Sequence, residues 1–205
     1  MLDTVRHIPA RELKARPWRN GGGITRLIAI HPEGAGDEDF IWRISAAEVS
    51  APGPFSIWEG VDRILMLTEG GPMRLLRTDT GAETVLASGA RLYFAGETPY
   101  AAELPAGPAR DFNLMLRRKQ AHGCVDLRSG AHQLPLRSGE TLLHCTHGRF
   151  RTTLPPRLGG ERLLETGDTL RITLDYVPAF TLGLTPLDPD ARLVDARINL
   201  YPGAA

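Results

Sequence analysis

The sequence predicts an all-β protein made of two similar units in tandem, and three observations support this fold class. Short runs in which apolar and polar residues nearly alternate recur along the 205-residue chain. Glycine and proline, at 22 and 16 residues, interrupt these runs at close spacing. No stretch of about 12 residues carries a convincing helical stripe, so we expect many short strands arranged as a sandwich or barrel.

The expected strands follow one another along most of the chain. Helical signals are confined to short stretches such as residues 9–14. The candidate strands are residues 25–30, 40–49, 64–68, 73–78, 91–95, 100–104, 112–116, 141–145, 169–174 and 179–184.

The prediction of two similar units rests on an internal repeat with a period of 78 residues. Residues 65–104 align with 143–182 without a gap and share 11 identical positions among 40, where chance would give about 3. The shared glycines fall at expected turns and the shared leucines on core faces. The alternative is a pair of unrelated β segments that are both rich in leucine and glycine. We interpret the chain as two copies of one β unit.

Each copy follows the order strand, glycine, hairpin, Ser/Thr-Gly and strand, which resembles the cupin barrel. The run at 165–172 is similar to the Gly-Asp turn of that fold. The resemblance implies a bicupin, with a first unit at 1–118 and a second at 119–205 packed as one compact body. The boundary is expected within 117–131, where polar residues and glycine dominate.

The composition argues against several classes of partner. Lys plus Arg and Asp plus Glu both number 24, so no excess charge favours nucleic acid or an anionic membrane surface. The two cysteines lack CxxC spacing, which is neither a disulfide framework nor a zinc-finger pattern. No leader-like or membrane-spanning apolar segment is evident. We therefore expect a cytoplasmic protein.

A metal site of the usual cupin type is not expected. Counting back from Gly70, the metal-binding His-x-His would fall near 56–59, where no histidine stands. His144 and His147 form the only close histidine pair, and side chains three apart on a strand point to opposite faces unless a bulge intervenes. Since imidazoles at suitable spacing are what a transition-metal site requires, we expect neither a metal nor another cofactor.

The stretch PWRNGGGITR at 17–26 is the first candidate for a ligand site. Three glycines allow close approach of the backbone to a ligand, and the flanking arginines and amide are suited to polar or anionic groups. The alternative is a plain turn that leads into the strand at 24–30. No Lys-Ser/Thr follows the glycines, which argues against a phosphate-binding loop.

Three further stretches are unusually polar for strands: 40–49, 53–63 and 110–115. Polar groups inside a barrel are costly unless they bond each other or a ligand, so these residues are candidates for a shared site. The alternative is that their charges form surface pairs of little energetic value.

The chain resembles the HutD/Ves family. The resemblance rests on PWRNGGGITR at 17–26, WRISAAEV at 42–49, GPFS at 53–56, GVDR at 60–63 and DFNLM at 111–115. It implies a bicupin without the usual metal. In its HutD branch it also implies a link to histidine utilisation and binding of N-formylglutamate or a related intermediate. The Ves branch is linked to a cold-induced protein. Arg19 stands where lysine is common, which keeps the charge but changes the donor geometry.

The expected function is regulatory binding of a small acidic metabolite, without nucleic acid or membrane and with a homodimer as a possible assembly. The alternatives are a metal-independent isomerase or hydrolase, with Glu48 or Asp111 as general base, and a protein-interaction scaffold. The expected ligand-binding residues are Trp18, Arg19, Asn20, Gly21, Gly22, Gly23, Thr25, Arg43, Glu48, Ser56, Asp62, Arg63, Asp111 and Asn113.

Overall fold

The structure, a computed structural model, describes residues 3–18, 20–175 and 180–204. Across these residues it is built from β-strands, with only two short 3-10 turns, η1 (Ala10–Glu12) and η2 (Pro156–Leu158). The helical signal at 9–14 is therefore a single turn. No helix of the described chain has the length and apolar character needed to cross a membrane.

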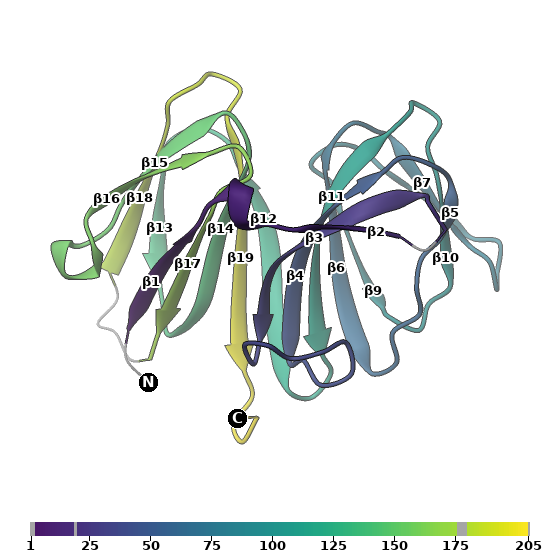
Figure 1. Cartoon of the computed structure of the whole chain (residues 1–205), viewed down its shortest axis with the longest axis horizontal. Coiled ribbons are helices and arrows are strands. Elements are labelled where there is room, and N and C mark those ends of the chain that lie inside the picture. The colour runs from purple at the N-terminus through teal and green to yellow at the C-terminus, as the bar shows by residue number, and fades with distance from the viewer. Residues whose placement is uncertain (1–2, 19, 176–179, 205) are drawn as a thin grey trace. The chain divides into compact units, whose positions relative to one another are not determined.

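The chain divides into two compact units, which we call the first unit (residues 14–122) and the second unit (residues up to 13 together with 123–203). The first unit contains two sheets, ordered β2-β3-β4-β11-β6-β9 and β5-β10-β7-β8 (Figure 1). Its strands are β2 (Ala15–Pro17), β3 (Gly23–His31), β4 (Trp42–Val49), β5 (Gly53–Pro54), β6 (Val61–Glu69), β7 (Met73–Arg77), β8 (Glu83–Leu86), β9 (Arg91–Ala95), β10 (Tyr100–Glu103) and β11 (Ala109–Arg117).

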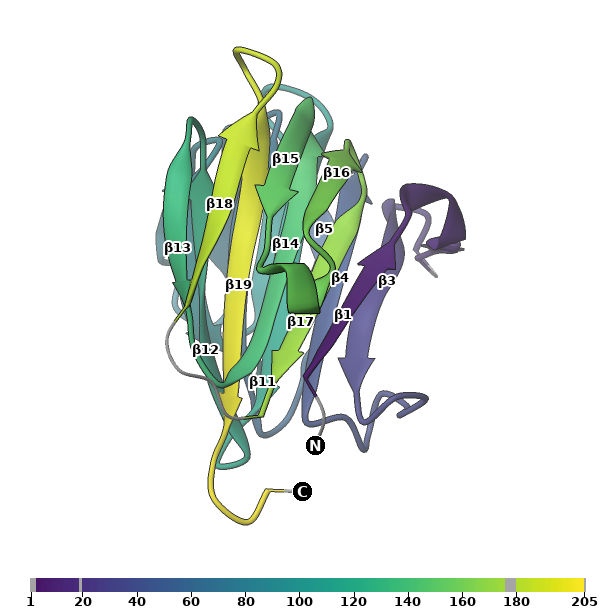
Figure 2. The ribbon, with the colours of Figure 1, turned by 90° about the vertical axis from the view of Figure 1, so that its left-hand side faces the viewer.

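The second unit also contains two sheets, ordered β1-β17-β14-β19-β12 and β13-β18-β15-β16. Figure 2 shows β1 beside β17 at the edge of the larger sheet. The strands are β1 (Thr4–Ile8), β12 (Ala121–Arg128), β13 (His132–Leu136), β14 (Gly139–His147), β15 (Arg149–Thr153), β16 (Glu161–Glu165), β17 (Thr169–Leu174), β18 (Phe180–Pro186) and β19 (Arg192–Leu200).

The two units repeat one strand order, as the 78-residue period predicts. The order β4-β11-β6-β9 in the first unit corresponds to β12-β19-β14-β17 in the second, and β5-β10-β7-β8 corresponds to β13-β18-β15-β16. The period relates β6 to β14, β8 to β16 and β9 to β17. Equivalent leucines, Leu65 and Leu143, lie buried on equivalent strands.

The start of the chain departs from the expected division at 118/119. The segment that ends at Leu13 groups with the second unit, because β1 pairs antiparallel with β17 from Thr4↔Thr173 to Ile8↔Thr169. The boundary between the two units, near 122/123, falls within β12. A strand that pairs with a segment more than 160 residues away cannot be located by local periodicity.

Each unit has its own apolar core. In the first unit the core includes Leu67, Met73 and Leu75, with Phe94 packed at its margin. In the second unit, buried leucines of β13, β14, β17 and β18 surround Phe150. The six-stranded sheet of the first unit is apolar at one end of its inner face and polar at the other, and the polar end forms the candidate site.

Candidate functional site

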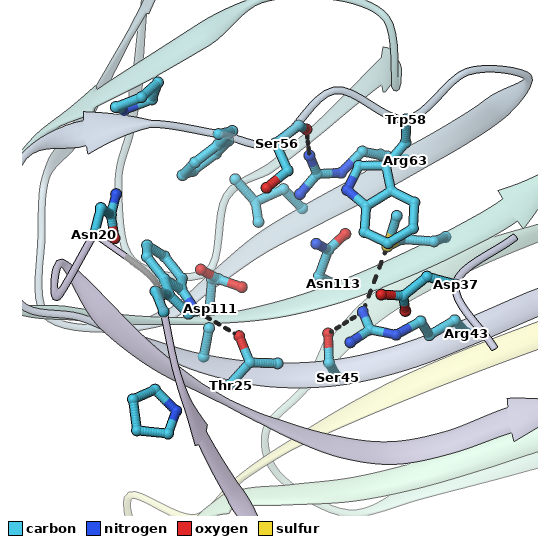
Figure 3. A pocket seen from close by; sticks show the side chains of 17 residues that line it. Asn20, Thr25, Asp37, Arg43, Ser45, Ser56, Trp58, Arg63, Asp111 and Asn113 are labelled. Atoms are coloured by element: carbon cyan, nitrogen blue, oxygen red, sulfur yellow. Dashed lines mark hydrogen bonds between the residues drawn. The ribbon is translucent and has the colours of Figure 1, made fainter.

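The first unit encloses a cavity of about 600 Å³ (Figure 3). This volume lies within the usual range for small-molecule sites, ~300–1,000 Å³. Its walls come from the inner face of the larger sheet and from residues 17, 18, 20, 37 and 54–58. The lining residues are Pro17, Trp18, Asn20, Thr25, Asp37, Arg43, Ser45, Ala47, Pro54, Phe55, Ser56, Trp58, Arg63, Leu65, Asp111, Asn113 and Met115.

Strand alternation places the polar side chains of the cavity on one face. β4 contributes positions 43, 45 and 47, and β11 contributes 111, 113 and 115. The two strands are antiparallel neighbours, with Asn113 opposite Ser45 and Met115 opposite Arg43. On the other side of β11, Arg63 of β6 is also opposite Met115. The register therefore brings both arginines beside the same strand.

Arg63 is the buried cation of the cavity. Its side chain is only 6% exposed, and its Cζ lies 4.9 Å from the Phe94 ring centroid and 5.5 Å from that of Phe55. Nη1 donates a long 3.4 Å hydrogen bond to the Ser56 carbonyl, whereas the buried Nε has no partner among the described residues. Burial lowers the pKa of Arg63 to about 10 although Asp111 opposes the shift, so the group stays charged at neutral pH.

Asp111 and Asn113 form the polar floor beside Arg63. Asp111 is 4% exposed, and burial raises the pKa of its carboxyl to about 7, with the nearby charge of Arg63 acting in the opposite direction. Asn113 is also buried, and its Oδ1 has no hydrogen-bond partner in the described chain. Buried polar groups in folded proteins are normally paired. These two residues therefore offer hydrogen-bonding capacity to a molecule in the cavity.

Arg43 is the second cation and is more exposed than Arg63. Its Nη1 makes weak contacts with Ser45 Oγ at 3.4 Å and with the Met115 sulfur at 3.6 Å, and its Cζ lies 6.0 Å from the Trp58 ring. Burial lowers the pKa of Arg43, while the carboxylate of Asp37, drawn beside it in Figure 3, acts to raise it. Because these contacts are long, the Arg43 guanidinium keeps hydrogen-bond donors for an anion.

Trp18 and Thr25 form one wall. The Trp18 indole Nε1 donates a 2.7 Å hydrogen bond to Thr25 Oγ1, which fixes the ring and leaves the threonine proton available to another acceptor. Asn20 lies near the wall, but its Oδ1 is occupied by the Gly22 amide at 3.0 Å.

The triple glycine is a turn, which was the simpler of the two interpretations. The Gly21 amide donates to the Trp18 carbonyl at 3.0 Å, and the Gly22 amide is bonded to Asn20, so neither is directed at a ligand. A Cβ at Gly23 would lie 2.4 Å from the Glu48 carbonyl, which explains why this position on β3 is glycine. None of the three glycines lines the cavity.

Two expected acidic site residues also lie outside the cavity. Glu48 accepts a hydrogen bond from Arg26 Nη1, and its neighbour Ala47 is the residue of β4 that faces inward. The Asp62 side chain is 54% exposed and pairs with Arg118 at 2.9 Å. Strand alternation turns Asp62 away whenever Arg63 points inward. Glu48 is thereby removed as a candidate base in this cavity, and Arg19 lies outside the described residues.

The structure thus brings eight of the expected residues together around the cavity: Trp18, Asn20, Thr25, Arg43, Ser56, Arg63, Asp111 and Asn113. It adds others that the sequence reasoning missed, including Asp37, Ser45, Phe55, Trp58 and Met115. Ser45 and Met115 could have been found from the alternation already used for Arg43 and Asn113. Asp37 lies in the acidic loop at 33–39, where its neighbours Glu38 and Asp39 are also carboxylates and nothing in the sequence singles it out.

The polar floor does not recur in the second unit. The 78-residue period places Thr141 at the position of Arg63, and the strand registers place Leu193 and Asp195 at those of Asp111 and Asn113. Asp195 is fully buried, but Arg128 and Arg197 bind its carboxylate at 2.9 and 2.8 Å. Its hydrogen-bonding capacity is used within the unit.

The histidine pair does not form a shared site. β14 carries a register shift between Cys145 and His147, yet His144 is buried against Thr169 Oγ1 at 2.8 Å while His147 pairs with Asp190 at 3.0 Å near the surface. No cluster of three or more metal-ligating His, Cys, Asp or Glu side chains occurs in the described parts of the chain.

Comparison with known proteins identifies relatives across most of the chain. The HutD family model matches residues 10–184. An uncharacterized 21.2 kDa protein in the hutC 3′ region of Pseudomonas putida is 30% identical over 156 residues, which cover 76% of this chain and 81% of that protein. Protein Ves of Cronobacter sakazakii is 38% identical over 116 residues, which cover 56% of this chain and 62% of Ves.

Solved structures agree with this relationship. A conserved protein of unknown function from Pseudomonas aeruginosa PAO1 superposes with a TM-score of 0.84 at 28% identity, covering 95% of this chain and 98% of that one. HutD from Pseudomonas fluorescens SBW25 superposes with a TM-score of 0.80 at 24% identity, covering 97% and 100% of the two chains, and supports the fold alone. The predicted all-β, cupin-like fold is confirmed. Together with the family match, these similarities show that the chain belongs to the HutD family.

Proposed function

We propose that this protein binds a small acidic metabolite in the cavity of its first unit. The observation that carries the proposal is Arg63, a charged guanidinium buried in the cavity wall whose Nε has no partner among the described residues and which makes no hydrogen bond with the nearby Asp111 carboxylate. A buried cation is costly unless an anion or hydrogen-bond acceptor compensates it. A ligand carboxylate supplies both.

N-formylglutamate, or a related intermediate of histidine degradation, is the ligand that we favour. It has two carboxylates, which match the two cations Arg63 and Arg43, and a formamide N–H, which suits Asn113 Oδ1. Each charge-assisted hydrogen bond contributes about 1.5–3 kcal/mol, so two of them together with burial against Trp18 and Phe55 support affinity on the order of micromolar.

We propose that this binding has a regulatory role. The family resemblance links the HutD branch to histidine utilisation, and the Pseudomonas putida relative is named for its position beside hutC. A protein that binds an intermediate of such a pathway in proportion to its concentration can report on or limit flux through the pathway.

Calorimetric titration of the purified chain with N-formylglutamate, urocanate and glutamate tests this proposal. We expect saturable heat with N-formylglutamate and weaker binding of glutamate, whose ammonium would lie among two cations. The absence of detectable heat for all three ligands at millimolar concentration would refute the proposal.

A second candidate function is metal-independent acid–base catalysis on the same class of acids. The observation in its favour is Asp111, whose pKa is raised to about 7 by burial and which faces the cavity. A base with a pKa near the working pH is well matched to proton abstraction. Turnover of an acidic substrate that is lost in Asp111→Asn, with stability retained, would favour catalysis over binding alone.

A further inference from the structure

Arg117 lies outside the cavity but contacts both segments that flank Arg43. It is the last residue of β11, and its guanidinium donates to three backbone carbonyls: Glu38 at 2.8 Å, Glu59 at 3.1 Å and Phe40 at 3.4 Å. The planar guanidinium fork of arginine can hold several acceptors in fixed directions, which a lysine ammonium cannot do in the same way. Arg117 therefore joins the segment before β4 to the segment before β6.

The bound carbonyls are adjacent in sequence to cavity residues. Glu38 follows Asp37, and Glu59 follows Trp58, and both Asp37 and Trp58 line the cavity. These are the two side chains that flank the Arg43 guanidinium, Trp58 at 6.0 Å from its Cζ and Asp37 as its nearby carboxylate. Asp37 and Trp58 are thus each adjacent in sequence to a residue whose carbonyl accepts a hydrogen bond from Arg117.

Aromatic packing strengthens the connection. The Arg117 Cζ lies 5.0 Å from the Phe40 ring, and Phe40 in turn packs edge-to-face on Trp58 with centroids 5.9 Å apart. The path from Arg117 to the Arg43 side chain therefore runs through Phe40 and Trp58 as well as through the backbone.

We propose that Arg117 is a positioning residue that holds Arg43 as an outer anion-binding group, distinct from the inner group Arg63. This inference rests on the proposed function, because it assigns the two cations to two different carboxylates of one ligand. Arg63 is buried between the Phe55 and Phe94 rings, and Phe94 lies on β9, outside the two segments that Arg117 joins, so we expect the orientation of Arg63 to depend less on Arg117 than that of Arg43 does. Loss of Arg117 should therefore weaken the contact made by Arg43 more than the contact made by Arg63.

The test compares N-formylglutamate with its two monoamides, N-formylglutamine and N-formylisoglutamine, each of which lacks one carboxylate. Arg43→Gln first identifies the outer carboxylate, since this variant should lose its preference for N-formylglutamate over one of the amides by about tenfold. We then expect Arg117→Met and Arg117→Lys to reduce the same preference by at least about threefold, and to leave the preference over the other amide unchanged. A ratio of affinities is not altered when a variant merely lowers the folded fraction.

Arg118→Met is the matched control. Arg118 is the adjacent arginine, but its main contacts are with the surface carboxylates of Asp62 and Glu97 at 2.9 and 3.0 Å. It should retain both wild-type preferences. If Arg117→Met keeps both preferences while Arg43→Gln loses one, the positioning role is wrong and the binding proposal stands. If the wild-type chain binds none of the three ligands, the binding proposal itself fails.

Discussion

Replacing Asp111 with asparagine should stabilise the protein relative to the wild type, and this gain in the free energy of unfolding should increase with pH. Asparagine has the shape of a protonated aspartate but does not titrate. In the folded protein, burial raises the pKa of Asp111 from 3.8 to about 7, and the charge of Arg63 only partly opposes this. The unfolded chain therefore loses the Asp111 proton at a lower pH than the folded chain does.

The magnitude follows from the difference in pKa. Below pH 4 both states are protonated and Asp111 has no pH-dependent effect. Between about pH 4 and 7 the folded state binds more protons, so the wild-type free energy of unfolding falls as pH rises. A shift of roughly three units corresponds to about 4 kcal/mol of lost stability above pH 7. The Asp111→Asn variant avoids this loss.

The assay is urea unfolding of both proteins at a series of pH values from 4 to 8. The difference in free energy of unfolding, variant minus wild type, should increase with pH by an amount on the order of 4 kcal/mol. All other titrating groups are common to both proteins and cancel. A difference that stays constant over this range would show that Asp111 is not the desolvated acid described here.

Four further substitutions have defined outcomes. Glu48→Gln and Asp62→Asn should each leave the affinity for N-formylglutamate within about twofold of wild type in calorimetry, because both side chains lie outside the cavity and exposed pairs contribute little. Burial lowers the pKa of His144 to about 4, so between pH 6.5 and 4 the unfolded chain binds a proton at this residue that the folded chain does not. The wild type therefore loses stability over this range, and urea unfolding should show a smaller loss for the His144→Gln variant. Gly23→Ala should destabilise the fold by about 1–3 kcal/mol in thermal unfolding, since the new Cβ would collide with the Glu48 carbonyl.

The tandem architecture could be predicted because the repeat is encoded locally. Leu65 and Leu143 are buried on equivalent strands, and the repeated glycines lie in the turns that follow equivalent strands. β1 could not be located in this way, since its partner β17 lies at the far end of the chain. β19 was also missed because Asp195 and Arg197 interrupt its apolar pattern, although they pair with each other on one face.

The candidate site could be predicted where strand alternation governs side-chain direction. Arg43, Asp111 and Asn113 share the inner face of two neighbouring strands, as their sequence positions suggest. The same alternation directs the side chains of Glu48 and Asp62 away from the cavity. Both were expected in the site because of the density of charged residues around them, without regard to the face of the strand on which each lies. The places of the loop residue Asp37 and of the positioning residue Arg117 near the site depend on long-range packing, which a single sequence does not show.

Titration of N-formylglutamate into the wild-type chain and into Arg63→Met tests the central claim most directly. We predict saturable binding by the wild type with a dissociation constant on the order of micromolar, and an affinity at least about tenfold lower for the variant, because one charge-assisted carboxylate contact is lost. The variant should remain folded in thermal unfolding, since methionine fills apolar space between Phe55 and Phe94. Equal affinities for the two proteins, or no binding by the wild type, would contradict the assignment of Arg63 as the inner anion-binding group.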